Sequence, residues 1–190
     1  MTNIGITGHR KLPDVDLCGP QVDAVLREIM SNFNGPYSLY SSLAEGADRL
    51  AVRRARDLLG ARLVVTLPLK LGEFLADFPA DSQLEFLGLL ALADQAIEMP
   101  AGLSRPEAYE SAGRFILDHV DVLIALWNGE PAKGRGGTGQ MVDEARTRGL
   151  PVAWIHAGAC LPRTSDSASL GPESLLVTYE RFVRAGRELE

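Results

Sequence analysis

Residues 122–127 read Val-Leu-Ile-Ala-Leu-Trp, and this run decides the fold class. Six apolar side chains in succession are typical of a strand that is buried on both faces of a parallel sheet. Shorter apolar runs predict further strands at residues 4–7, 37–41, 63–67, 95–99 and 152–155. Because segments of helical periodicity separate these runs, the sequence predicts an α/β protein with a Rossmann-like three-layer α/β/α fold and a mostly parallel central sheet.

Apolar residues spaced by three and four predict the helices between the strands. The inward stripe of the first helix consists of Val22, Val25, Leu26, Ile29, Met30 and Phe33. The second stripe, which ends before Gly60, consists of Ala47, Leu50, Ala51, Ala55, Leu58 and Leu59.

Two later helices are predicted from residues of their first turns. Ser82 and Glu85 have the spacing of a capping box, and the helix that follows would bury Leu84, Leu87 and Ala91. Pro106 suits the first turn of the next helix. The inward positions of that helix are Tyr109, Ala112, Ile116 and His119.

A chain of 190 residues has the size of one domain, so a single Rossmann-like domain is expected over residues 1–190. Residues 158–172 are expected to form a loop. The terminal element, residues 173–190, would either pair as an edge strand or begin a helix.

Composition argues against a disordered, collagen-like or coiled-coil chain, and charge argues against two kinds of partner. Hydrophobic residues make up 46% and charged residues 23% of the chain, values typical of globular proteins. The formal net charge of -6 argues against nucleic acid and anionic membranes as partners. No apolar stretch is long enough to cross a bilayer. The chain enters its first strand directly after Met1, so a cytoplasmic location without a signal peptide is expected.

Cysteines and histidines give no sign of a metal site. Cys18 and Cys160 lie far apart, and the only histidines are His9, His119 and His156. Neither set has the spacing of a zinc site. No metal and no cofactor are therefore expected.

Polar residues and glycines gather directly after three of the predicted strands. Gly8-His9-Arg10 follows the first strand, residues 41–48 follow the second, and Asn128 opens the segment after residues 122–127. In an open parallel sheet, ligands bind beyond the carboxyl ends of the strands, where the strand order reverses. The three clusters are therefore expected to line one rim.

Glycines 134, 136, 137 and 139 form the most informative cluster. A glycine-rich turn into a helix amino terminus presents free N–H groups and the positive end of the helix dipole to an anion. Thr138 is expected to cap this helix. Phosphate is the expected ligand, and a flexible surface turn is the structural alternative.

Charged residues at the rim have two interpretations each. Arg10 would contact phosphate, or it would lie on the surface beside a His9 that packs over the strand end. Glu45 and Asp48 would stabilise a helix amino terminus, or they would accept hydrogen bonds from ribose hydroxyls.

Aromatic residues near the rim are candidates to flank a nucleobase, namely Trp127 and Phe74. Aromatic side chains of the connection 68–81 could equally cover the edge of the sheet. The full set of predicted ligand-binding residues is Gly8, His9, Arg10, Ser42, Glu45, Gly46, Asp48, Trp127, Asn128, Gly136, Gly137, Thr138 and Gly139.

Taken together, these residues resemble the SLOG superfamily, which joins the DprA/Smf proteins, the LOG phosphoribohydrolases and bacterial nucleotide-sensor domains. The similarity spans roughly residues 3–155. It is carried by Gly8-His9-Arg10, residues 42–48, Leu67-Pro68 with Asp77-Phe78, residues 123–129, and Gly136-Gly137-Thr138. The resemblance implies a Rossmann-like fold that binds nucleotides or nucleotide-derived molecules, including ADP-ribose-type signals. It also implies a homodimer, and it looks closest to the sensor-like branch.

The glycine loop departs from the pattern of the LOG enzymes, which reads P-G-G-x-G-T-x-x-E and whose glutamate takes part in cleaving a base from ribose 5′-monophosphate. Arg135 replaces the proline, Gln140 the threonine, and Asp143 the glutamate. Asn128 stands where relatives often carry an aspartate.

The sequence therefore predicts a sensor or binding domain for a nucleoside monophosphate or an ADP-ribose-type ligand. The alternative is a LOG-like phosphoribohydrolase in which Glu45 or Asp143 is catalytic. A third hypothesis, single-stranded nucleic-acid binding, needs a basic groove with stacking aromatics, which the acidic composition does not favour.

Overall fold

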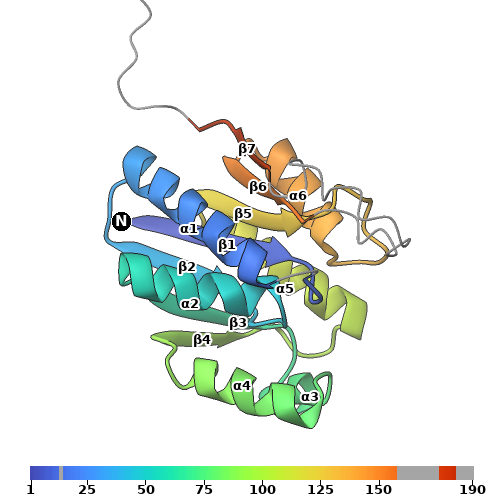
Figure 1. Ribbon diagram of the computed structural model, residues 1–190. Coiled ribbons are helices and arrows are strands. Elements are labelled where there is room, and N and C mark those ends of the chain that lie inside the picture. Colours follow the sequence, from blue (N-terminus) through green and yellow to red (C-terminus); the bar gives the residue numbers. More distant parts are fainter. Residues whose placement is uncertain (13–14, 158–175, 183–190) are drawn as a thin grey trace, which may run out of the picture.

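A computed structural model describes residues 1–12, 15–157 and 176–182 of the chain. Within these residues one seven-stranded sheet has the order β4-β3-β2-β1-β5-β6-β7 (Figure 1). The strands are β1 (Thr2–Gly8), β2 (Tyr37–Ser41), β3 (Arg62–Leu67), β4 (Gln95–Glu98), β5 (Val122–Trp127), β6 (Val152–His156) and β7 (Val177–Glu180). Neighbouring strands are parallel except β6 and β7, which are antiparallel.

Helices cover both faces of this sheet, as Figure 1 shows. They are α1 (Val15–Asn32), α2 (Ala47–Leu59), α3 (Leu71–Leu75), α4 (Ala80–Leu90), α5 (Arg105–His119) and α6 (Thr138–Thr147). Strand β5 is buried along its whole length. Its side chains alternate between the core under α1 and α2, which takes Ile124, and the core under α5 and α6, which takes Leu123. The predicted α/β/α layers and mostly parallel sheet are confirmed.

The strand order reverses at β1. From β1 the chain proceeds outward through β2, β3 and β4, and it then returns to place β5 on the other side of β1. The crevice beyond the carboxyl ends of β1 and β5 is where such sheets bind ligands.

Strand β7 pairs antiparallel with β6, so the terminal element contains an edge strand rather than beginning with a helix. The loop predicted at 158–172, Cys160, and residues 183–190 of the terminal element lie outside the described residues. That the chain forms one domain stays a prediction.

Helix α4 buries a different face from the one the sequence predicted. Leu84 is 75% exposed, Leu87 is 40% exposed and Ala91 is exposed too, whereas Phe86 and Leu89 are buried. The helix has apolar residues all round, so periodicity alone does not identify the inward side. Phe86 decides it, because its ring packs against Phe74 and Phe78 with centroids 5.5 and 5.4 Å away.

Four further expectations about the helices are wrong, among them the inward position of Leu58, which is 37% exposed. Ser82 and Glu85 do not form a capping box, because α4 already begins at Ala80 and both side chains instead accept hydrogen bonds from Arg49. His119 is exposed, and its ring stacks on Phe115 with centroids 4.0 Å apart. Met30 is 49% exposed, because it lies at the margin of the stripe of α1.

The orientation of α4 predicts unequal effects for two leucines of the same helix. Leu84→Ala is expected to change the free energy of unfolding by less than about 0.5 kcal/mol, because the side chain is mostly in solvent. Leu89→Ala is expected to lower it by about 2 kcal/mol, because a buried side chain is lost. Urea unfolding followed by circular dichroism measures both. Equal losses would contradict the observed orientation.

Candidate functional site

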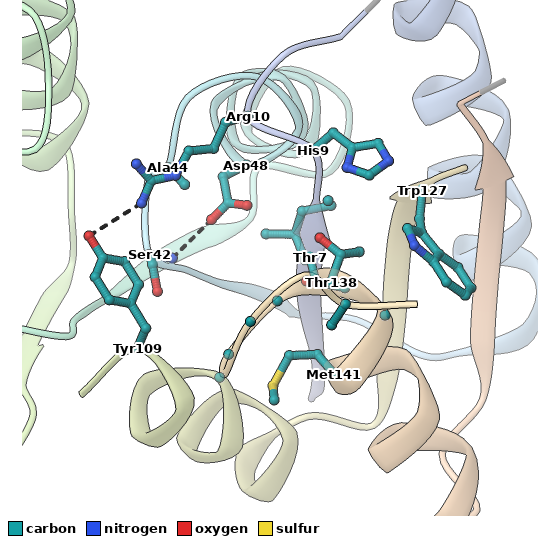
Figure 2. Close-up of a pocket in the computed structure, with 18 of the residues that line it drawn as sticks. Thr7, His9, Arg10, Ser42, Ala44, Asp48, Tyr109, Trp127, Thr138 and Met141 are labelled. Atoms are coloured by element: carbon teal, nitrogen blue, oxygen red, sulfur yellow. Dashed lines mark hydrogen bonds between the residues drawn. The ribbon is translucent and has the colours of Figure 1, made fainter. Parts of the chain in front are cut away.

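A cavity of about 610 Å³ opens at the carboxyl ends of β1, β2 and β5 (Figure 2). It brings together residues from all three predicted clusters. Of the predicted ligand-binding residues, those that line it are Gly8, His9, Arg10, Ser42, Asp48, Trp127, Asn128, Gly136, Gly137, Thr138 and Gly139. Glu45, Gly46 and Asp143 do not line it. The three clusters thus share one rim, while the contacts of each residue with a ligand stay a prediction.

Gly8 lets three elements meet at the base of the cavity. A Cβ atom at this position would lie 2.4 Å from Cβ of Ala47 and 2.8 Å from the carbonyl oxygen of Leu126. The next residue, His9, accepts a hydrogen bond at Nε2 from the amide of Asn128 at 3.2 Å. These contacts fix the end of β1 against α2 and β5, so His9 has a structural partner at the rim.

Gly46 has a role in packing rather than in lining the cavity. Its φ is +73°, and a Cβ atom there would lie 2.5 Å from the carbonyl oxygens of both His9 and Arg10. The amide of Ala47 donates to the oxygen of His9 at 3.1 Å. The loops after β1 and β2 can therefore meet only because residue 46 has no side chain.

Asp48 is a buried carboxylate, only 5% exposed, in the wall of the cavity. Its Oδ2 accepts hydrogen bonds from the hydroxyl of Ser41 at 2.8 Å and from the amide of Ser42 at 3.1 Å. Burial raises the pKa of Asp48 to about 6, although these hydrogen bonds and the nearby Arg10 guanidinium oppose the rise. Asp48 therefore holds the loop after β2 and also places a carboxylate beside Arg10.

Arg49, which the sequence did not single out, supports the same loop from behind. It is 2% exposed, and its Nε donates to the carbonyl oxygen of Leu43 at 3.0 Å. Leu43 is fully buried in a left-handed conformation, with φ of 55°. This strained backbone persists because the surrounding contacts hold it in place.

Helix α6 begins one residue earlier than the sequence predicted. Gly137 is the N-cap residue and Thr138 is the first residue of the helix, so Thr138 does not cap it. The amide of Gly136 donates to Oε1 of Gln140 at 2.8 Å, and the amide of Gly137 donates to the oxygen of Gly134 at 3.2 Å. Two of the three amides expected to bind phosphate, those of Gly136 and Gly137, thus already have partners, whereas the third belongs to Thr138.

The unused amides lie in the first turn of α6. Within the described part of the chain, the amides of Thr138, Gly139 and Gln140 donate no hydrogen bond. Thr138 and Gly139 line the cavity. The amides left for the predicted anion are therefore those at the start of the helix, from Thr138 onward, rather than those of the preceding glycines.

Glu110 of α5 anchors the glycine loop. Its carboxylate accepts hydrogen bonds from Nε2 of Gln140 at 2.7 Å and from Nε of Arg135 at 2.9 Å. The hydrogen bond from Gln140, with further contributions from Arg135 and Arg114, lowers the pKa of Glu110. Arg135 is thereby engaged with α5 at the edge of the cavity.

Neither aromatic residue predicted to flank a base presents an open ring face. Trp127 is 6% exposed and packs against Trp154 with centroids 5.2 Å apart. Phe74 is fully buried in the core, so the alternative that the connection 68–81 covers the edge of the sheet is the one observed. The aromatic ring that lines the cavity and is half-buried belongs to Tyr109, which the sequence placed only on a helix face.

The two carboxylates expected to act in hydrolysis lie outside the cavity. The side chain of Asp143 is 72% exposed and is paired with Arg146. Glu45 is half-exposed and does not line the cavity. In residues 1–12, 15–157 and 176–182, no three side chains of His, Cys, Asp or Glu are grouped so that they could hold a metal ion.

The fold and the cavity define a Rossmann-like α/β protein with an open pocket at the switch point of its sheet. No protein-family model matches the sequence, and no curated protein is significantly similar to it. No helix among the described residues is long and apolar enough to cross a membrane.

Among solved structures, the chain is similar to DNA processing protein A (DprA) from Streptococcus pneumoniae, with a TM-score of 0.56 and 20% sequence identity. The match covers 87% of this chain and 54% of DprA, so the chain spans about half the length of that protein. This similarity confirms the fold that the SLOG resemblance implied. The sensor-like branch stays a prediction.

Two other structures match less well. The structure of TM1055 gives a TM-score of 0.47 at 17% identity, and the match covers 80% of this chain and 72% of the TM1055 chain. The Moco carrier protein of Chlamydomonas rheinhardtii gives a TM-score of 0.45 at 16% identity, and the match covers 82% of this chain and 76% of the carrier protein.

Proposed function

We propose that this protein binds a nucleotide or a nucleotide-derived ligand, of the nucleoside monophosphate or ADP-ribose type, and acts as a sensor or binding domain. The observation that carries the proposal is the first turn of α6, where the amides of Thr138 and Gly139, two residues that line the cavity, are unused among the described residues. Such amides, together with the positive end of the helix dipole, bind phosphate groups.

The size and position of the cavity support this proposal. Pockets for small molecules and cofactors enclose roughly 300–1,000 Å³, and this one encloses about 610 Å³. It lies beside β1 and β5, where the strand order reverses. Asp48 offers a carboxylate of the kind that accepts hydrogen bonds from ribose hydroxyls.

Hydrolysis of an N-glycosidic bond has less support than binding. Glu45 and Asp143, the residues that it would need, both lie away from the cavity lining. A cytoplasmic location and a homodimer stay predictions.

The proposal is tested by calorimetric titration with nucleoside monophosphates, ADP-ribose and cyclic nucleotides. Thr138→Asp is expected to weaken binding at least about tenfold, because a carboxylate in the first turn of α6 repels the phosphate. The same substitution is expected to leave the melting temperature unchanged or to raise it, because acidic residues stabilise helix amino termini.

Thr138→Asn is the matched control, since it is nearly the same size as aspartate and carries no charge. It is expected to bind within about threefold of the unmodified protein, because the phosphate meets no added charge. No binding by any compound in the panel, or equal binding by both variants, would contradict the proposal.

A further inference from the structure

We infer that the cavity has two chemically distinct ends, and that the base of the ligand lies on the guanidinium of Arg10 while its phosphate lies at the amino terminus of α6. This inference rests on the proposed function and adds the orientation of the ligand. It also changes the role of Arg10, which the sequence had assigned to phosphate.

Arg10 is held by two aromatic rings at one end of the cavity. Its Cζ lies 5.5 Å from the ring centroid of Tyr109 and 5.7 Å from that of Phe78. Its Nη2 donates to the hydroxyl of Tyr109 at 3.3 Å, as Figure 2 shows. The residue is nevertheless exposed and lines the cavity. The guanidinium therefore has aromatic support and remains accessible to a ligand.

The supporting rings are themselves fixed. The hydroxyl of Tyr109 donates to Asp77, and Asp77 also pairs with Arg105. The ring of Tyr109 meets that of Phe74 edge-on, with centroids 5.9 Å apart. Arg10, which follows β1, is thus presented by residues from α5 and the segment after β3. A flat, delocalised guanidinium held in this way stacks well on a nucleobase.

The charges around the cavity favour phosphate at the amino terminus of α6 rather than at Arg10. Asp48 lies close enough to Arg10 for the two charges to interact, so a phosphate at Arg10 would also meet a buried carboxylate. The amino terminus of α6 instead offers unused amides, and Lys133 lines the cavity from the preceding loop. Glu130, on the same loop, also lines the cavity, but it is exposed, so solvent screens its charge more than that of the buried Asp48. An uncharged base suits the Arg10 end, and a phosphate suits the α6 end.

This orientation also names the class of ligand more closely. The two rings that the sequence proposed for stacking, Trp127 and Phe74, are buried. Arg10 is accessible in the cavity lining, and its planar guanidinium lies beside the half-buried ring of Tyr109. The ligand is therefore expected to carry a planar heteroaromatic base as well as a phosphate, so that a sugar phosphate alone binds less tightly.

Calorimetry with AMP, adenosine and ribose 5-phosphate separates the two ends. Arg10→Lys keeps the positive charge but removes the planar group. It is expected to lower the affinity for AMP and for adenosine by roughly tenfold, the scale of one stacked base. Its affinity for ribose 5-phosphate is expected to stay within about twofold, because the phosphate end is untouched. Thr138→Asp is expected to show a different pattern: weaker binding of AMP and ribose 5-phosphate, and unchanged binding of adenosine.

Each other outcome has a definite meaning. If Arg10→Lys weakens ribose 5-phosphate as much as AMP, Arg10 contacts the phosphate and the inferred orientation is wrong. If Arg10→Lys leaves AMP and adenosine unchanged, the base lies elsewhere and the inference is also wrong. If the unmodified protein binds none of the three compounds, both the proposed function and this inference fail. Arg10 is exposed, so loss of folding does not confuse the comparison.

Discussion

Gly46→Ala is expected to lower the free energy of unfolding by about 3 kcal/mol, from a positive φ angle and from an overlap with two carbonyl groups. The φ of +73° is unfavourable for any residue with a side chain. The added Cβ would also lie 2.5 Å from the oxygens of His9 and Arg10. The loops after β1 and β2 must then separate, which disturbs the rim of the cavity. Urea unfolding measures the loss.

Substitutions at two other glycines separate the contribution of the positive φ from that of the overlap with the carbonyl groups. Gly60 has φ of +58° with no atom near its missing side chain, so Gly60→Ala is expected to cost only about 1 kcal/mol. Gly88 lies within α4 with ordinary φ and open space, so Gly88→Ala is expected to stabilise the protein by up to about 1 kcal/mol. If Gly46→Ala costs no more than Gly60→Ala, the two loops do not meet as described.

Asp48→Asn is expected to remove a pH-dependent loss of stability of about 3 kcal/mol between pH 4 and pH 7. Burial raises the pKa of Asp48 from 3.8 to about 6. Between these two values the folded state keeps a proton that the unfolded state has released. The contribution of Asp48 to the free energy of unfolding therefore falls as the pH rises through this window. Asparagine does not ionise, so the variant lacks this fall.

The measurement is the difference in unfolding free energy between variant and unmodified protein at several pH values. Asp94→Asn serves as a control of opposite sign, because a hydrogen bond from the amide of Leu63 lowers the pKa of Asp94. Asp94 contributes stability above the unfolded pKa, and this is lost as the pH falls. A difference for Asp48→Asn that stays constant from pH 4 to pH 7 would show that the carboxylate is not buried.

The strands and the position of the site could be predicted because both depend on the order of residue types along the chain. The apolar run at 122–127 corresponds to β5, and the strand expected at 37–41 corresponds to β2. Polar residues directly after these strands lie at one rim because parallel strands end on the same side. Local sequence is sufficient for both conclusions.

Other parts of the site depend on contacts between distant residues. Arg49 is buried because it binds the oxygen of Leu43 and the side chain of Glu85, and nothing in the helical periodicity of α2 indicates this. The glycine pattern showed where the backbone could approach a ligand. It did not show that the side chain of Gln140 accepts the hydrogen bond of the Gly136 amide.

The central place of β1 has a consequence for how the chain assembles. The amide of Asn3, in this strand, bonds the side chain of Asp121, a residue 118 positions later. Contacts between such distant residues close large loops and slow folding. The β1–β2–β3 side has much shorter connections, so we expect it to form first during synthesis at the ribosome. The cavity at the carboxyl ends of β1, β2 and β5 would then be completed only when the segment around β5 has emerged and docked.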